Sequence, residues 1–242
     1  MSYKSAEKKF YEKHYGESLG NFNSTIDHNK IRDNYFKFGS RYYLVDKVVQ
    51  KISNRKILLE IGCGLGDTLR YMSETYGFNH SIGIDIAFKE KVAIEGKNFI
   101  EMMPANFNEN LPFNDNSIDL LVAMMVIEHV FDPFHAFSDI HRLLSKDGVA
   151  VINLPLVTSL KNRIRIIFGQ LPITSVPFKR WLTDREWDGN HLHYFNVDSI
   201  EQLCKVCNLK IIETSAVGKL TSLKNIFLSL LASELTFAVK RI

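Results

Sequence analysis

The sequence predicts an α/β protein built around a mainly parallel, doubly wound sheet. Short apolar stretches rich in β-branched residues alternate with segments of helical character along most of the chain, and this order is typical of repeated strand–helix units. A length of 242 residues suits one such domain with a small appendage. A hydrophobic content of 45% is sufficient for a packed core.

Each expected element follows from local features. The apolar stretch 56–62 predicts the first strand, and the segment after its glycines predicts a helix that ends at Gly77. A helix is expected over 131–148, because Pro133 lies near its start and Gly148 just past its end. Further strands are expected over 80–86, 117–124, 149–155, 210–214 and 234–242, and further helices over 199–210 and 219–232.

Two regions fall outside this alternation and predict the domain organisation. Residues 1–50 carry aromatic side chains among charges and are expected to form a helical cap beside the first strand. Residues 51–155 are expected to form the cofactor-binding half of the core, and residues 191–242 its C-terminal part. Residues 156–190 are too long for a plain connection and predict an insertion that covers a substrate. The insertion carries six cations (Lys161, Arg163, Arg165, Lys179, Arg180 and Arg185) against Asp184, Glu186 and Asp188.

The first predicted strand leads into a loop with glycine at every second position, Gly62, Gly64 and Gly66. A dinucleotide fingerprint, G-x-G-x-x-G, would require a further glycine where this chain has Asp67. The carboxylate of Glu60, just before the loop, would repel a pyrophosphate and instead suits a ligand that bears an ammonium group.

The next predicted strand ends in Asp85, about 20 residues after the glycine loop, where an acid can accept hydrogen bonds from both ribose hydroxyls. A nucleoside with free ribose hydroxyls, no phosphate and a cationic amino-acid tail is S-adenosylmethionine. The pattern therefore favours an S-adenosylmethionine site over a glycine turn that only joins strand to helix, and over a nicotinamide or flavin site.

These motifs resemble those of the class I S-adenosylmethionine-dependent methyltransferases, of the broad group that includes ubiquinone-biosynthesis O-methyltransferases. ILLEIGCGLG is similar to the first motif of the group, GIDI to the second, and PANFNENLPFNDNSIDLLVAMMVIEHVFDP to the pattern that runs through the third and fourth strands. The resemblance covers residues 45–156 well and residues 190–242 more loosely. It implies a Rossmann-like sheet of seven strands with the last strand antiparallel.

The resemblance also implies which residues hold the cofactor. Asn106 occupies the position, usually Asp, that reaches the adenine amino group, and its amide oxygen can accept the same hydrogen bond. Phe107 would lie by the adenine face, and Met124 would flank the methyl donor. The full set implied is Glu60, Gly62, Cys63, Gly64, Gly66, Asp85, Ile86, Asn106, Phe107 and Met124.

Two histidines are candidates for the general base that a hydroxyl acceptor requires. The segment MMVIEHV resembles the E-V-x-E-H pattern of ubiquinone-type and small-RNA 2′-O-methyltransferases, which can supply metal ligands. Met125 replaces the first Glu while Glu128 and His129 remain, and the loss of a hard oxygen ligand predicts a reaction without a metal. His191 aligns with the histidine of an H-L-x-F-F-T segment in methyltransferases of polysaccharide biosynthesis. Loop ordering by His129, and capping or packing by His191, remain alternatives.

The insertion resembles segments of both MetW-type proteins and sugar-modifying methyltransferases. The sequence therefore predicts O-methylation of a small molecule or a sugar or glycan precursor. The cations of the insertion are candidates to hold an anionic group on the acceptor, and a solvated basic face is the alternative. Trp187 and Tyr194 are candidates to line a sugar or aromatic site, and a buried aromatic cluster is the alternative. The alternative function is that of a MetW-like accessory or regulatory protein. The complete first motif and the longer N-terminus favour an enzyme.

Charge and composition narrow the expected partners and location. A net charge of +3 and the lack of an appended binding domain argue against nucleic acid. The polar N-terminus and the lack of a long apolar stretch predict a cytoplasmic protein without a membrane span. Cys204 and Cys207 lack a second pair and are expected to be reduced thiols. The apolar segment 219–232 is expected to pack against the core, with a dimer face or a membrane-surface contact as alternatives.

Overall fold

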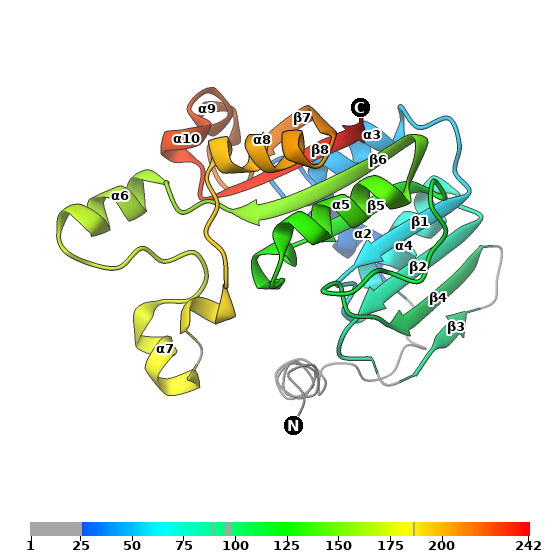
Figure 1. The fold of residues 1–242 in the computed structure, drawn as a ribbon, viewed down its shortest axis with the longest axis horizontal. Coiled ribbons are helices and arrows are strands. Elements are labelled where there is room, and N and C mark those ends of the chain that lie inside the picture. The colour runs from blue at the N-terminus through cyan, green and yellow to red at the C-terminus, as the bar shows by residue number, and fades with distance from the viewer. Residues whose placement is uncertain (1–25, 89, 95–97, 186) are drawn as a thin grey trace.

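A central sheet runs through the protein, with helices on both of its faces (Figure 1). The computed structural model describes residues 26–242 apart from 89, 95–97 and 186, so the first half of the expected N-terminal cap lies outside the described residues. The strands are β1 (Ile57–Ile61), β2 (His80–Asp85), β3 (Val92–Ile94), β4 (Phe99–Pro104), β5 (Ile118–Met124), β6 (Leu144–Pro155), β7 (Leu209–Ala216) and β8 (Glu234–Arg241).

The order of the strands in the sheet is β3-β4-β2-β1-β5-β6-β8-β7. The pairs among β4, β2, β1, β5 and β6 are parallel, whereas β3 is antiparallel to β4, and β8 is antiparallel to both of its neighbours. The chain winds outward in one direction from β1 and in the other from β5. The carboxyl ends of β1 and β5 therefore meet at the switch point where doubly wound sheets bind their ligands.

Two hydrophobic clusters cover the two faces of the sheet. On one face, β1 contributes Leu59 to a cluster that includes Phe137 and Leu203; on the other, Leu58 packs in a cluster with Val45. This alternation follows from the period of two in a strand. The helices of the core are α2 (His28–Ile31), the π-helix η2 (Arg32–Phe36), α3 (Tyr43–Val49), α4 (Asp67–Tyr76), the 3₁₀ turn η3 (Ile127–His129), α5 (Pro133–Leu143) and α8 (Val197–Val206).

The predicted fold class is confirmed, but the sheet of the described residues has eight strands where the resemblance implied seven. The additional strand is β3, a short piece that pairs antiparallel with β4 at the edge of the sheet. The predicted antiparallel orientation of the last strand is confirmed, since β8 pairs antiparallel with β6.

The helix expected over 131–148 ends earlier, at Leu143, so Gly148 does not follow its end. The carbonyls of Arg142 and Leu143 accept the backbone N–H groups of residues 116 and 117, and the chain continues directly into β6. A Cβ on Gly148 would lie 2.5 Å from the carbonyl oxygen of Ile118, so this glycine permits the close approach of β6 to β5. The start was correctly predicted, because Pro133 occupies the first turn and Asp132 caps it.

The segment between β6 and α8 extends away from the sheet (Figure 1). It contains α6 (Leu160–Ile167), α7 (Phe178–Asp184) and the turn η4 (Trp187–Asn190). Two short helices, α9 (Thr221–Ile226) and α10 (Leu228–Leu231), lie between β7 and β8. Among the described residues, no helix combines the length and the apolar character needed to cross a membrane.

Candidate active site

The glycine loop after β1 adopts backbone conformations that other residues rarely reach. Gly62 has φ +71°, and a Cβ there would lie 2.5 Å from Cγ2 of Val126, two residues past the end of β5. Gly64 has φ +51°, and a Cβ there would meet none of the described atoms within 4 Å. The loop therefore packs closely against the β5 end on one side and leaves open space on the other, where a ligand can approach the backbone.

Asp85 at the end of β2 is bound to this loop. Its carboxylate accepts the backbone N–H of Gly64 at 3.1 Å and that of Ala87 at 3.0 Å. A carboxylate offers about four lone-pair sites, so two remain for the hydroxyls of a ribose. The backbone bonds also hold the carboxylate toward the loop.

Glu60, near the end of β1, is buried beside the loop. Its Oε1 accepts the hydroxyls of Tyr42, at 2.6 Å, and Thr68, at 2.7 Å. Its Oε2 is buried and has no hydrogen-bond partner within the described part of the chain. Burial raises the pKa of Glu60 to about 7, and the two hydroxyl bonds oppose the shift. An ammonium group beside Oε2 would favour the ionised form, so the site suits the amino-acid end of S-adenosylmethionine.

The other residues of the expected cofactor site lie around the same edge of the sheet. Asn106 follows β4, and its Oδ1 accepts both the backbone and the side-chain N–H of Asn108, at 2.9 and 3.0 Å. An adenine amino group would have to compete with those bonds. Phe107 is buried in the core with only 6% of its surface exposed, so its contact with adenine stays a prediction. Cys63 is buried in the loop, while Ile86 and Met124 are half-buried at strand ends.

The structure brings the two predicted histidines together, although 62 positions separate them in the chain (191 − 129). The rings of His129 and His191 are 4.9 Å apart between centroids and nearly perpendicular, at 75°. The backbone holds them there, since the carbonyl of Glu128 accepts the N–H of Leu192 at 2.8 Å and that of His193 at 3.3 Å. The insertion therefore returns to the β5 end before α8 begins.

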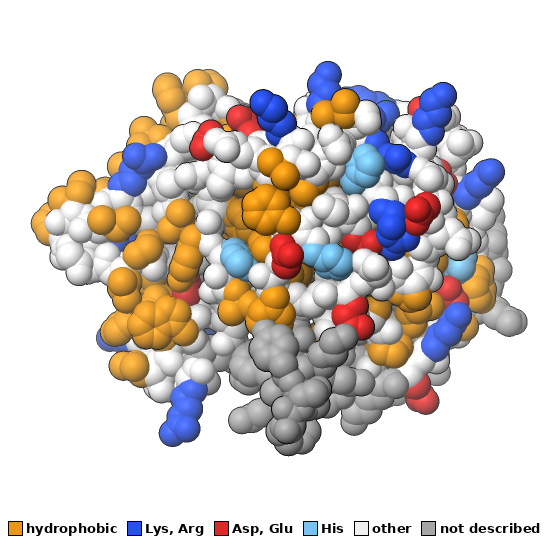
Figure 2. All heavy atoms as spheres, in the orientation of Figure 1, with side chains coloured by type: hydrophobic (Ala, Val, Ile, Leu, Met, Phe, Trp, Pro, Cys, Tyr) orange, Lys and Arg blue, Asp and Glu red, His pale blue; other side chains and the backbone are white. Residues whose placement is uncertain are grey.

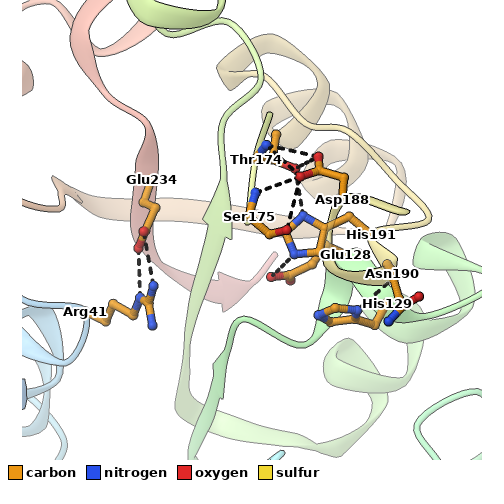
Figure 3. A network of polar contacts seen from close by, with 9 residues as sticks. All are labelled: Arg41, Glu128, His129, Thr174, Ser175, Asp188, Asn190, His191 and Glu234. Carbon is orange, nitrogen blue, oxygen red and sulfur yellow. Dashed lines mark hydrogen bonds and ion pairs between the residues drawn. The ribbon is translucent and has the colours of Figure 1, made fainter. Parts of the chain in front are cut away.

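Hydrogen bonds determine which nitrogen of His191 carries the proton (Figure 3). The Thr174 hydroxyl donates to Oδ2 of Asp188 at 2.6 Å, so its oxygen accepts from Nδ1 of His191 at 2.7 Å. In the neutral ring the lone pair then lies on Nε2, which is 3.9 Å from Oε1 of Glu128. The buried Asp188 carboxylate also accepts backbone and hydroxyl bonds from Ser175, and this anchors the loop to the histidine.

His129 has the same tautomer for a simpler reason. Its Nδ1 lies 3.1 Å from the carbonyl oxygen of Asn190, and a carbonyl can only accept. Nδ1 therefore carries the proton, and the lone pair of the neutral ring is on Nε2. Burial lowers the pKa of His129, which keeps the ring neutral at pH 7.

Glu128 lies beside the two histidines, and the three residues form one cluster. Burial disfavours the charged form of this acid as well. Glu128 is fully buried, and neither of its carboxyl oxygens has a hydrogen-bond partner within the described residues. Burial raises the pKa of Glu128 to about 8. Burial, and then the neighbouring His129, lower the pKa of His191 to about 4. At neutral pH the cluster therefore holds a protonated carboxyl group and two neutral imidazoles.

These three residues also have the geometry of a possible cation site. Glu128, His129 and His191 each offer one ligand atom, and the atoms lie within 4.8 Å of one another. Two imidazoles and a carboxylate would suit a transition metal better than Mg²⁺. A cation there would have to displace the proton from Glu128. The metal-free reaction expected from Met125 remains a prediction.

A charged pair lies near this neutral cluster (Figure 3). The guanidinium of Arg41 makes two bonds to the carboxylate of Glu234, at 2.8 and 3.1 Å. Hydrogen bonding to Glu234 raises the pKa of Arg41, and the acid Glu128 is close enough to add to that effect. The pair joins the segment before α3 to the start of β8.

Sequence reasoning missed several residues that shape the site. Tyr42 reaches Glu60 from the N-terminal segment, and no local pattern points to it. The D-G-N turn immediately before His191 was a usable signal for Asp188, because such a turn often needs left-handed backbone. Thr174 is separated from both partners by the whole of α7. The exposed rings of Trp187 and Tyr194 do not form the buried cluster that was the alternative to a binding role.

Three features meet at the switch point of this doubly wound sheet: a left-handed glycine loop, an acid at the end of β2 and a buried carboxylate that faces the loop. Together they define a class I S-adenosylmethionine-dependent methyltransferase. Within the part of the chain that the structure describes, Oε2 of Glu60 has no partner and the space over Gly64 is open, and both features fit the cofactor of that class. The chain belongs to the methyltransferase domain family, whose model matches residues 37–214.

Individual relatives are distant. The chain is 22% identical over 122 residues to malonyl-[acyl-carrier protein] O-methyltransferase of Marinomonas sp. (strain MWYL1), which covers 49% of this chain and 45% of the relative. It is 29% identical over 149 residues to norajmaline N-methyltransferase of Rauvolfia serpentina, and this match covers 53% of this chain and 51% of the relative. The chain thus spans about half the length of these curated relatives.

A solved structure supports the fold over nearly the whole domain. An S-adenosylmethionine-dependent methyltransferase from Mesorhizobium loti superimposes with a TM-score of 0.60 over 84% of this chain and 99% of that protein. The identity is 14%, so this likeness concerns the fold.

Proposed function

We propose that this protein transfers the methyl group of S-adenosylmethionine to a hydroxyl group of a small molecule or of a sugar or glycan precursor. The observation that carries the proposal is the pair of neutral imidazoles at the β5 end, next to the glycine loop. The hydrogen bonds of His129 and His191 leave the lone pair of each ring on Nε2. A hydroxyl acceptor needs such a base, whereas a neutral amine does not.

Positioning supplies much of the rate in this reaction. S-adenosylmethionine, when bound, provides a methyl group already activated by its sulfonium. Glu60 and Asp85 would hold its amino-acid and ribose parts at the carboxyl ends of β1 and β2. The acceptor would lie between the ends of β5 and β6 and the segment 156–195, with its hydroxyl toward the histidines.

His129 is the stronger candidate for the base. Its side chain is half-buried and can be reached by an acceptor, whereas His191 is buried. A pKa of about 4 also makes the His191 ring a weak base. We assign His191 a positioning role, in which its ring packs against His129 and its Nδ1 bond anchors the insertion. Burial moves the pKa of both histidines below the ordinary value of about 6.5.

Two features support a sugar-like acceptor with an anionic group. Trp187 and Tyr194 have exposed rings and lie within four residues of His191 in the chain, and aromatic faces suit sugar rings. The insertion of residues 156–190 carries six Lys or Arg residues, and Arg41 lies near the cluster in its pair with Glu234. Nucleic acid is not an expected partner, since the net charge is only +3.

The experiment combines binding with product analysis. Calorimetry with S-adenosylmethionine should show binding, and incubation of the protein with a small-molecule extract and methyl-labelled cofactor should label a hydroxyl compound and release S-adenosylhomocysteine. The Asp85→Ala protein is the matched control and should label nothing. Cofactor binding without any labelled product would favour the MetW-like accessory role. A labelled amine would point instead to N-methylation, which the name of one relative carries.

A further inference from the structure

The segments that flank the site expose many apolar side chains in place of burying them. These side chains lie on α6, α7 and the α9–α10 pair. Together with the Lys and Arg residues of the same segments, we call them the apolar–basic patch. Figure 2 shows hydrophobic side chains gathered over the lobe that holds α6 and α7 and over the adjoining α9–α10 region, with Lys and Arg between them. Exposed apolar areas of this extent usually mark a surface that binds something.

Helix α6 is oriented opposite to the usual surface helix. Its apolar residues Leu160, Ile164 and Ile167 recur at helical spacing on one face, and all are exposed, with Ile167 at 78%. Phe168, just past the helix, is 76% exposed. Among the described residues of α6, the buried one is polar: Asn162 exchanges two hydrogen bonds with the backbone of Ile173. The polar contact therefore anchors the helix, and the apolar face points away from the core.

The α9–α10 pair repeats this arrangement. Its buried residue, within the described side chains, is Thr221, whereas Ile226 is 72% exposed and Phe227 is half-exposed. The guanidinium of Arg163 on α6 donates to the backbone carbonyl of Ser229 at 3.2 Å, so the two exposed faces are neighbours. Leu228 and Ala232 do reach the core, so the packing that the sequence favoured for residues 219–232 is found in part of this segment.

The charges in these segments are almost all positive, and the acid on α7 is its last residue, Asp184. Residues 157–183 contain five Lys or Arg and no Asp or Glu, and residues 218–232 contain two Lys and no acid. The whole chain, by contrast, has 30 basic and 27 acidic residues. Apolar side chains interleaved with cations are the composition of segments that lie in the interface of an anionic membrane.

We propose that the apolar–basic patch docks the protein on the surface of an anionic lipid bilayer. The inference goes beyond the proposed function and does not depend on it. A second copy of this chain is a poorer occupant, because a symmetric contact would place the same cations against each other. Residues 1–25 offer four Lys and only three Glu, so they do not supply the missing negative charge.

The test is sedimentation of the full chain with vesicles of phosphatidylcholine, with and without phosphatidylglycerol. The protein should bind the anionic vesicles, and salt should weaken the binding. Replacing Ile167 and Phe168 together by Ser should lower the partition at least about tenfold, because two large apolar side chains no longer enter the interface. Lys161→Glu with Lys179→Glu should lower it further on anionic vesicles.

Matched controls lie on α8, outside the patch. Val206→Ser replaces an apolar residue that is 65% exposed, and Lys205→Glu reverses an exposed cation; both should leave vesicle binding unchanged. Failure of the wild-type protein to bind anionic vesicles would overturn the proposal, as would binding that is insensitive to the Ile167 and Phe168 replacements. A wild-type dimer that light scattering shows to dissociate in that double variant would assign the patch to a second copy instead.

Discussion

The carboxyl group of Glu128 lies 3.9 Å from Nε2 of His191, and the two side chains are only 0% and 3% exposed. Two groups that would form an ion pair on the surface are here kept neutral, because burial penalises the charged form of each. The pair is therefore a source of pH-dependent stability, and its two members act in opposite directions.

Glu128 should make the protein less stable as the pH rises. Its folded pKa of about 8 is above the ordinary value of 4.5, so its stabilisation is full below 4.5 and is lost as the pH rises through about 8. The pKa of His191 is lowered, so the stabilisation that this residue contributes is full above its ordinary value of 6.5 and is lost as the pH falls through about 4. Between about pH 7 and 8 the free energy of unfolding should therefore fall mainly because of Glu128, whose titration lowers it by about 1 kcal/mol.

Urea unfolding of Glu128→Gln checks this prediction. The glutamine cannot titrate, so between about pH 7 and 8 the free energy of unfolding of this variant should fall much less than that of the wild-type protein. The remaining decline comes from Glu60, whose pKa burial raises to about 7. Glu213→Gln is the matched control, because hydrogen bonds from Lys51 and Lys47 lower the pKa of Glu213 and move its titration to acid pH. The control should keep the wild-type decline. An equal decline in Glu128→Gln would show that Glu128 is ionised in the folded protein.

Cofactor affinity should rise with pH through the titration of Glu60. Burial raises the pKa of this carboxyl to about 7, and the ammonium group of the cofactor favours its ionised form. Binding near pH 6 should therefore release a proton, and the dissociation constant should fall several-fold on going to pH 7.5. Calorimetry in buffers of different ionisation enthalpy measures both effects. Glu60→Gln should bind weakly and without the pH dependence; a flat profile for the wild-type protein would contradict the assignment.

Asp85→Ala should weaken binding of S-adenosylmethionine roughly tenfold or more, because hydrogen bonds to a charged group contribute about 1.5–3 kcal/mol each. The dissociation constant from calorimetry is the measurement. Asp147 is an exposed acid near the start of β6, away from the glycine loop, so Asp147→Ala should bind S-adenosylmethionine normally. An unchanged dissociation constant in Asp85→Ala would remove Asp85 from the cofactor site.

His129→Ala should lower turnover on an identified hydroxyl acceptor about 10²–10⁴-fold, with nearly unchanged cofactor affinity. His191→Ala should have a smaller effect on turnover and should also raise the KM of the acceptor, because the insertion loses its anchor. His141→Ala, on α5, serves as the control. Near-normal turnover in both site variants would mean that positioning alone, or another group, explains the chemistry.

Activity should survive EDTA without loss, since Met125 stands where the resembled pattern has its first acidic ligand. The measurement is turnover with and without chelator, followed by addition of Mg²⁺, Mn²⁺ or Zn²⁺. Loss of activity with EDTA and recovery with one of these ions would identify Glu128, His129 and His191 as a metal site, since their ligand atoms are already within 4.8 Å of one another.

The cofactor half of the protein was accessible from the sequence because its signals are local. The strand before Gly62, the glycine spacing and the acid at the end of the next strand are each read within a few residues. Neighbouring parallel strands then bring these ends together in any doubly wound sheet. The exposed left-handed loop and the bond between Asp85 and Gly64 agree with that interpretation.

The acceptor half was decided by tertiary structure. Only the path of the insertion brings His191 back to His129, and only the Thr174–Asp188 bond determines which nitrogen of His191 carries the proton. The end of α5 is another example, because the hydrogen bonds that end the helix come from the loop before β5. The sequence by itself determined the sheet, the glycine loop and the type of cofactor, since these depend on local periodicity and backbone conformation. The tertiary structure decided the protonation of the histidine cluster and the outward face of α6, since both depend on burial among residues that are distant in the chain.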